Sequence, residues 1–516
     1  MYIKMCAVFS VVAVLSASTL LFAQSGSAFQ FTGKAGPNAV GLKVVDQYDF
    51  SRTYRAMTDD LGKPYNGERA RPLQIVVWYP ADTGPGTPMK VMDYSDLNAT
   101  ETNFDGPTAA DKAEEAKEAK DPVMAEPMWA IRDAPMKAGH FPVVVYAPSL
   151  SDVSWENADL CEYLASHGYV VLASPSLGAS AREMTIDVAG ANAQATDISF
   201  LIGYARTLPD ADMSAVAVAG YSWGGIANLF AAARDNRIKA LVSLDGSMRY
   251  FPALVKQAGD VHPDQMTIPL LFFTSRQQTL EDLESTGNNK MAFAAPNVLN
   301  EWTHGDLITV NMLGLTHGEF SSMDQRNEGA GGGFADYGNE DGIAGFAWIA
   351  RYTLQFLDAY LKQDPVAMAY LKKTPAENGV PKHMMDTSFR AAKGVAPSMD
   401  GFRAELDRQG FDHAEEIYAA IKEENKEFTL DEDAVNAWAY ELMQEGHLRE
   451  ATALLKLNVQ NYPDSGNVYD SLGEAYMKSG QKQLAIDNYR KSLEKDPDND
   501  NAKQKLKELE GNPAAK

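Results

Sequence analysis

Between residues 141 and 362 the chain alternates short, almost wholly apolar runs with longer stretches of mixed apolar and polar positions. Six runs predict buried strands: 141–149 (FPVVVYAPS), 169–175 (YVVLASP), 215–222 (AVAVAGYS), 239–246 (KALVSLDG), 268–275 (IPLLFFTS) and 307–313 (LITVNML). Four stretches between or after them predict helices: 157–168, 197–207, 223–235 and 345–362. Strands that are apolar at every position belong to a sheet covered on both faces, which is typical of parallel strands. The pattern therefore predicts an α/β domain with a mostly parallel sheet and helices on both faces.

The flanking regions have other patterns. Residues 40–104 are typical of short strands joined by turns, with one strand at 73–80 (LQIVVWYP). Residues 105–125 are charged and poor in large apolar side chains, so we expect an exposed insertion. The α/β domain should then span 29–365. Residues 366–400, in a region rich in proline, predict a linker.

The last part of the chain, 401–516, contains an internal repeat of 34 residues. Gly446, Ala451 and Pro463 recur as Gly480, Ala485 and Pro497. The second copy also carries aromatic and small residues at matching offsets: Tyr469, Leu472, Gly473, Tyr476 and Tyr489. This pattern resembles the tetratricopeptide repeat, which implies stacked helix pairs that bind other proteins. We predict an all-α repeat domain here.

The first 28 residues predict a targeting segment. Lys4 is followed by an apolar run from Met5 to Ala23 and then by small residues (QSGSA). That layout is typical of a secretory signal cleaved after Ala23 or Ala28. Because the run is almost long enough to span a bilayer, a retained anchor is the alternative. We expect an exported protein, periplasmic or secreted, with no membrane span once the signal is removed.

Composition narrows the possible functions. A chain of 516 residues is too long for one compact domain, and its net charge of −24 argues against binding nucleic acid or anionic membranes. The acidic balance and the lack of an amphipathic anchor also argue against work at a lipid surface. Cys6 and Cys161 are the only cysteines, which excludes a disulfide scaffold and a cysteine-rich metal site.

The motif GYSWGG (220–225) is the first candidate for chemistry. It follows a predicted strand and begins a predicted helix, the position of a nucleophile elbow. A turn flanked by glycine exposes the hydroxyl of Ser222 above the sheet. Amide N–H groups at the start of the helix can then stabilise developing negative charge.

A nucleophilic serine needs a histidine base and an orienting carboxylate. His317 directly follows the strand at 307–313, whereas His262 and His304 lie in less suitable positions. Two carboxylates remain open as the acid. Asp245 ends the strand that follows the elbow, and Asp282 follows the next strand.

Several ordered segments resemble platelet-activating-factor acetylhydrolase and, more widely, dienelactone-hydrolase-like esterases. They are the run from 141 to about 185, GYSWGG, LVSLDGSMRYFP (241–252) and ITVNMLGLTHGEFSS (308–322). The resemblance covers roughly 70–362 and implies an α/β-hydrolase fold. It assigns the acid to Asp245, the base to His317 and the oxyanion amides to Leu150 and Trp223. This chain has Pro148-Ser149 where the family usually has His-Gly, so we expect the loop to hold Leu150 differently.

Together these features predict an exported serine hydrolase that cleaves carboxylic esters through an acyl-enzyme and needs no metal or organic cofactor. Its substrate would be a small-molecule ester, and its repeats would bind a protein partner. A peptidase or dienelactone-type hydrolase with the same triad is one alternative. Another is an inactive scaffold in which only the repeats work.

Overall fold

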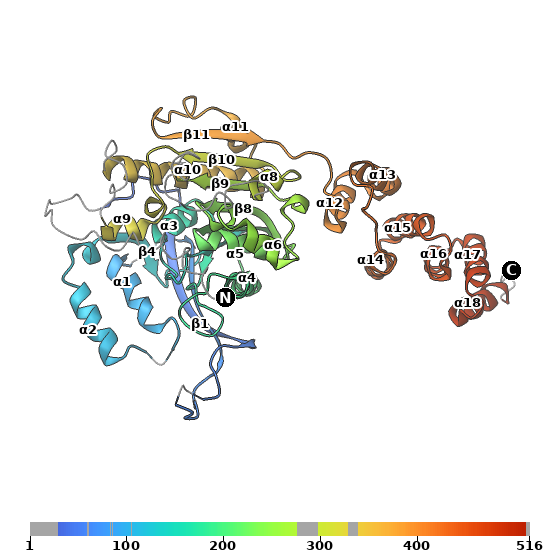
Figure 1. Cartoon of the computed structure of the whole chain (residues 1–516), viewed down its shortest axis with the longest axis horizontal. Coiled ribbons are helices and arrows are strands. Elements are labelled where there is room, and N and C mark those ends of the chain that lie inside the picture. The colour runs from blue at the N-terminus through green and yellow to red at the C-terminus, as the bar shows by residue number, and fades with distance from the viewer. Residues whose placement is uncertain are drawn as a thin grey trace, which may run out of the picture. The chain divides into compact units, whose positions relative to one another are not determined.

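The computed structural model describes residues 29–511, apart from 59–60, 83, 85, 105, 276–297 and 329–338. It divides the chain into a larger unit that ends at Ala392 and a smaller one that comprises Lys393–Lys516 and the short segment Gln265–Thr267 (Figure 1). The predicted signal at 1–28 and the alternative acid Asp282 lie outside the described residues.

A single mixed sheet forms the centre of the larger unit. In the described part of the chain its strand order is β11-β10-β9-β8-β7-β5-β6-β2-β1-β4-β3. The strands are β1 (Ala39–Thr53), β2 (Ala70–Ala81), β3 (Pro88–Lys90), β4 (Pro127–Arg132), β5 (Phe141–Ala147), β6 (Val170–Ala173), β7 (Ala211–Tyr221), β8 (Ile238–Leu244), β9 (Leu270–Thr274), β10 (Leu307–Met312) and β11 (Met385–Arg390). From β6 through β5 and β7 to β10 every neighbouring pair is parallel, whereas β2 and β11 pair antiparallel with this block. The predicted α/β class is confirmed.

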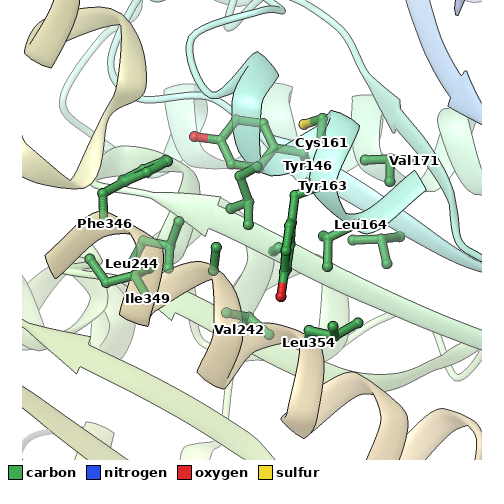
Figure 2. Close-up of a cluster of buried hydrophobic side chains, with 14 of the residues drawn as sticks. Tyr146, Cys161, Tyr163, Leu164, Val171, Val242, Leu244, Phe346, Ile349 and Leu354 are labelled. Carbon is green, nitrogen blue, oxygen red and sulfur yellow. The ribbon is translucent and has the colours of Figure 1, made fainter. Parts of the chain in front are cut away.

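Helices cover both faces of the parallel block. They are α3 (Ala158–Ser166), α4 (Val188–Ala205), α5 (Trp223–Ala232), α6 (Pro252–Ala258) and α10 (Asn339–Leu361). Tyr146, Val171 and Val242 pack in one apolar cluster with α3 and α10, as Figure 2 shows. Their chain neighbours, such as Val145 and Leu172, are also buried but lie outside this cluster, because alternate side chains point to the opposite face. Because helices cover both faces of the sheet, the strands of the parallel block are apolar at nearly every position.

The linker prediction for 366–400 is wrong in its first part. The helix α11 (Pro365–Lys372) packs on α10, and β11 pairs antiparallel with β10 from Met385↔Met312 to Arg390↔Leu307. Met384 and Met385 are buried in the same apolar cluster as α10. The sequence pattern missed β11 because its alternating, largely polar composition (MDTSFR) is that of an edge strand.

The region before β5 also differs from the prediction of short strands. The strand β1 is 15 residues long and pairs with β2 along almost its whole length. Short helical segments follow, namely α1 (Val91–Ser95), η1 (Asp96–Thr100) and η2 (Pro122–Ala125). Within the charged segment 105–125 lies the helix α2 (Ala109–Glu118), which has no buried residue.

The smaller unit is built of helices alone within its described residues. They are α12 (Met399–Gln409), η6 (Phe411–His413), α13 (Ala414–Glu424), α14 (Glu432–Glu445), α15 (Leu448–Asn461), α16 (Gly466–Lys478), α17 (Lys482–Lys495) and α18 (Asp500–Glu510). Gly446 and Gly480, one repeat apart, both have positive φ where a helix ends. Ala451 and Ala485, also one repeat apart, are fully buried in the helix core. The 34-residue period therefore reflects equivalent helix ends and equivalent close helix contacts.

The corrected boundary predicts where the chain can be cut. A protein ending at Ala392 should unfold cooperatively, because it keeps the complete sheet. A protein ending at Asp364 loses β11 and the buried Leu371, Met384 and Met385, each of which contributes about 1.5–3 kcal/mol on burial. It should melt well below the longer protein or aggregate. Equal melting curves in circular dichroism would restore the linker prediction.

Candidate active site

Ser222 occupies a sharp turn between β7 and α5. Its backbone has φ 51° and ψ −116°, a strained conformation for a residue with a side chain. Three backbone hydrogen bonds hold the turn: Ser222 N–H donates to Leu244 O, and Ser222 O accepts from Gly225 and Ser247. This geometry raises the Ser222 hydroxyl at the carboxyl edge of the parallel strands.

The glycines of GYSWGG allow α5 to begin directly against the sheet. A Cβ atom on Gly224 would lie 2.0 Å from Ala147 O, at the end of β5. A Cβ atom on Gly225 would lie 2.6 Å from the Cα of Gly246, in the loop after β8. Each approach is too close for any other residue. The motif therefore brings the loops after β5 and β8 up to Ser222.

His317 lies in the loop after β10 and faces Ser222. Its Nε2 atom is 2.9 Å from Ser222 Oγ, and its backbone carbonyl accepts a 2.8 Å hydrogen bond from the Tyr221 hydroxyl. The Tyr221 and His317 rings lie 4.9 Å apart. Tyr221 thus supports the histidine at two points, from the position before the serine.

Asp245 follows β8, with φ 45°, and completes the chain of contacts. Its Oδ2 atom lies 2.6 Å from His317 Nδ1. Its Oδ1 atom accepts hydrogen bonds from the Tyr250 hydroxyl at 2.9 Å and the Ser275 N–H at 3.1 Å. Burial raises the pKa of Asp245, but the His317 and Ser275 contacts outweigh it, so the net pKa is lowered. The carboxylate is therefore ionised at neutral pH.

These contacts fix the roles of the two histidine nitrogens. An ionised carboxylate only accepts hydrogen bonds, so the proton on His317 lies on Nδ1 and Nε2 is left to accept from Ser222. The side chain of His317 is 49% exposed and that of Asp245 only 2%. The structure brings together Ser222, His317 and Asp245. The histidine that bonds Ser222 is thus neither His262 nor His304.

The two amides expected to bind an oxyanion also lie at this edge. Trp223 is the first residue of α5, where an amide N–H has no partner within the helix. Leu150 lies in the loop after β5, whose start contacts Gly224. Among the described residues, neither amide donates a hydrogen bond to a protein acceptor. Both are thus available to a ligand.

Comparisons with known proteins find matches in both units of the chain. Residues 99–254 match the profile of the Chlorophyllase family, and 466–499 match the tetratricopeptide repeat. The first match includes Ser222 and Asp245. No curated protein matches the chain. Among solved structures, the ferulic acid esterase from Streptomyces cinnamoneus matches at 18% identity and a TM-score of 0.47, over 70% of this chain and 99% of that one.

Sequence reasoning missed Glu156, a buried carboxyl group in the same loop as Leu150. Its Oε2 atom accepts from the Ser149 N–H at 2.9 Å and from the Tyr146 hydroxyl at 3.1 Å. Burial and then the nearby charge of Asp152 raise the pKa of Glu156 well above its usual range. A glutamate in a loop gives no sign of such burial in the sequence.

The next residue, Asn157, joins this loop to the histidine loop. Its side chain donates to Phe320 O at 3.0 Å and accepts from Ser322 N–H at 2.8 Å. The backbone carbonyl of Glu156 also accepts from Met323 N–H. Thus residues 156–157 hold the Leu150 loop and the His317 loop in a fixed relation.

Two features are absent from the described residues. No cluster of three or more His, Cys, Asp or Glu side chains is arranged to hold a metal ion in that part of the chain. None of the helices found there is long and apolar enough to cross a bilayer.

The glycine contacts predict a difference in stability between two Gly→Ala variants. Gly224→Ala should destabilise the protein by about 1–3 kcal/mol, because its Cβ would overlap the Ala147 carbonyl. Gly203→Ala in α4 is the matched control, since its Cβ would meet no atom within 4 Å. It should be neutral or stabilising by up to about 1 kcal/mol. Chemical denaturation measures both, and equal effects would disprove the packing argument.

Proposed function

We propose that this protein is an exported serine hydrolase that cleaves carboxylic esters through an acyl-enzyme. One observation carries the proposal: a continuous line of hydrogen bonds from Ser222 Oγ through the His317 ring to Asp245. A serine, a histidine and an ionised carboxylate in this order are the parts that nucleophilic acyl transfer needs.

In the first half-reaction Ser222 Oγ attacks the ester carbonyl carbon while His317 Nε2 takes the hydroxyl proton. The charge of Asp245 stabilises the imidazolium so formed. The carbonyl oxygen becomes an oxyanion, which the N–H groups of Leu150 and Trp223 bind. Collapse of this tetrahedral intermediate breaks the bond to the alcohol oxygen, which leaves with the proton from His317.

The second half-reaction uses the same groups on water. His317 Nε2 removes a proton from a water molecule, which attacks the acyl carbon and forms a second oxyanion. The Ser222 ester bond then breaks, and the serine oxygen recovers the proton from His317. The products are a carboxylic acid and free enzyme, so each cycle consumes one water and requires no cofactor.

Two measurements separate this proposal from its alternatives. A fluorophosphonate probe should label Ser222, whereas an inactive scaffold would stay unlabelled. Rates on p-nitrophenyl esters from acetyl to palmitoyl, compared with rates on peptide and lactone substrates, then define the reaction class. Faster turnover of peptides or lactones than of every ester would favour the peptidase or dienelactone-type alternative.

The two ends of the chain extend the proposal. The apolar run from Met5 to Ala23 supports export, and the repeat at 466–499 supports binding of a protein partner through the smaller unit. The substrate class proposed for the larger unit is a small-molecule ester.

The contacts of Asp245 predict the effect of Asp245→Asn. With its oxygen kept by the Tyr250 and Ser275 donors, the new amide would point its NH₂ group at His317 Nδ1. That arrangement favours the tautomer with the proton on Nε2, which cannot accept from Ser222. We expect kcat to fall by on the order of 10³–10⁴ with little change in KM, and Ser222→Ala to lose about 10⁶ in kcat.

Asp282→Asn is the control for this experiment, because Asp282 is the alternative acid in the sequence. It should leave kcat unchanged. A crippled Asp282→Asn enzyme beside a normal Asp245→Asn enzyme would transfer the role of acid to Asp282, provided that both variants melt like the parent.

Export predicts the N-terminus of the protein in its native host. Mass spectrometry should find a chain that begins near Gln24 or Phe29, because cleavage sites follow small residues at the end of the apolar run. An intact N-terminus at Met1 in a membrane fraction would indicate a retained anchor, and in the cytoplasm it would disprove export.

A further inference from the structure

Several of the exposed large apolar side chains among the described residues lie in or next to the connection between β1 and β2. Phe50 is 77% exposed, Met57 70% and Leu61 92%, and Tyr65 (39%) lies in the same hairpin. Ile186 (50%) lies in the loop after β6. Only two other large apolar residues among those described are comparably exposed, Val366 and Leu484. We call the first five the hairpin patch. An apolar concentration of this kind marks a surface that binds something.

The sheet topology places the hairpin patch at the catalytic edge. The strand β2 is antiparallel to β6, so its first residue lies where β6 and the other parallel strands end. The strand β1 pairs antiparallel with β2, with Thr53 opposite Ala70. The connection between β1 and β2 therefore projects from the same edge as Ser222, and Figure 1 shows it extending, in blue, from the body of the larger unit.

Described contacts join this hairpin to the proposed oxyanion loop. Arg71, at its base, donates to the carbonyls of Leu177 and Gly178 at 2.9 and 2.7 Å. Farther along the same loop, Met184 N–H donates to Ser151 Oγ at 2.6 Å, and Arg182 donates to Ser151 O at 2.9 Å. Ser151 is the neighbour of Leu150. The hairpin patch and the active site are thus parts of one connected edge.

Specific ion pairs and hydrogen bonds hold the hairpin while its apolar side chains stay exposed. Arg52 and Arg71 both pair with the buried carboxylate of Asp197 on α4, at 2.7 and 2.5 Å. Near the tip, Tyr65 N–H donates to Met57 O at 2.9 Å, which fixes two patch residues side by side. The exposure of the patch is therefore a feature of a braced hairpin.

The charges of the hairpin segment and of the whole chain indicate which kind of surface the hairpin patch binds. Segment 50–70 carries four basic and three acidic residues, so it is nearly neutral in a chain whose net charge is −24. An anionic lipid surface would repel the protein as a whole, whereas a zwitterionic one would not. Phe50 and Tyr65 are residue types that favour a lipid–water boundary, and separate projecting side chains suit a fluid surface.

We propose that the hairpin patch docks the enzyme on a zwitterionic lipid–water interface, so that the catalytic edge faces esters held in that interface. This inference rests on the proposed esterase function for its substrate, but not for the docking itself. It reverses the expectation, drawn from the acidic composition, that the protein does not work at lipid surfaces.

The test compares four versions of the chain from Phe29 to Lys516, made without 1–28 because that apolar run would itself enter lipid. They are the parent, Phe50→Ser/Leu61→Ser, Leu61→Ser, and Val366→Ser, whose parent residue is 74% exposed but lies on α11. Binding is measured by flotation with vesicles of phosphatidylcholine and, separately, of phosphatidylglycerol. Activity is measured on soluble p-nitrophenyl butyrate and on p-nitrophenyl palmitate embedded in the vesicles.

We expect the parent and Val366→Ser to bind the vesicles, and Phe50→Ser/Leu61→Ser to bind at least tenfold more weakly. The double variant should lose activity on the embedded ester by a similar factor but keep its rate on the soluble ester. Leu61→Ser alone should lie between, which guards against a folding defect in the double variant.

Three results would overturn the docking proposal: no binding of the parent to phosphatidylcholine, binding only to anionic phosphatidylglycerol vesicles, or equal binding by the double variant. An apolar protein partner for the patch would then be the remaining explanation for its exposure. Vesicle binding without hydrolysis of either ester would instead sustain docking and contradict the proposed function.

Discussion

The site depends on one steric constraint, the contact between the start of α5 and the ends of β5 and β8. No side chain separates them, because Gly224 lies against the Ala147 carbonyl and Gly225 against Gly246. Ser222 can hold its strained backbone only because the surrounding sheet fixes both sides of the turn through Leu244 and Ser247. The same contact sets how close the oxyanion loop and the Asp245 loop come to the serine. Direct backbone packing at these two glycines thus positions the groups that follow three strands, β5, β7 and β8.

Buried polar groups then fix the loops that the glycines bring together. Asp245 is almost fully buried, and its charge is stable there because His317, Tyr250 and Ser275 all donate to it. Glu156 is fully buried with only two donors, and burial raises its pKa. The pKa values of the two carboxyl groups shift in opposite directions because their surroundings differ, although both lie in loops at the same edge of the sheet. Asp245 accepts the N–H of the histidine, and Glu156 accepts hydrogen bonds within the Leu150 loop.

A feature of this structure could be predicted when it leaves a pattern in the sequence, and not when it arises only from tertiary packing. The strands were evident because both faces of the sheet are covered. The positions of Ser222 and His317 followed because the carboxyl ends of parallel strands meet at one edge, whereas the choice of Asp245 over Asp282 rested on the family resemblance. The strand β11 was not evident, since its alternating polar pattern resembles a loop beside prolines. Glu156 and Tyr250 gave no signal, because burial and the direction of a hydroxyl group arise only from tertiary packing. Phe50 and Leu61 resemble ordinary strand or loop residues in the sequence, and only the structure shows that they are 77% and 92% exposed.

Arg52 and Arg71, at the base of the hairpin, connect the hairpin to the loops of the catalytic edge. A buried ion pair such as Arg71–Asp197 adds little net stability, because the free energy of desolvating two charges offsets most of their attraction. Its contribution here is geometric. The Asp197 carboxylate on α4 pairs with Arg52 from β1 and with Arg71 from β2. Arg71 also donates hydrogen bonds to the loop that contacts Ser151. Two apolar side chains of the same volume would fill this space without fixing those directions. A hairpin that binds a surface must transmit its orientation to the serine, and directional hydrogen bonds do so where apolar packing would allow sliding. The charged base and the apolar tip of the hairpin therefore serve the same proposed task.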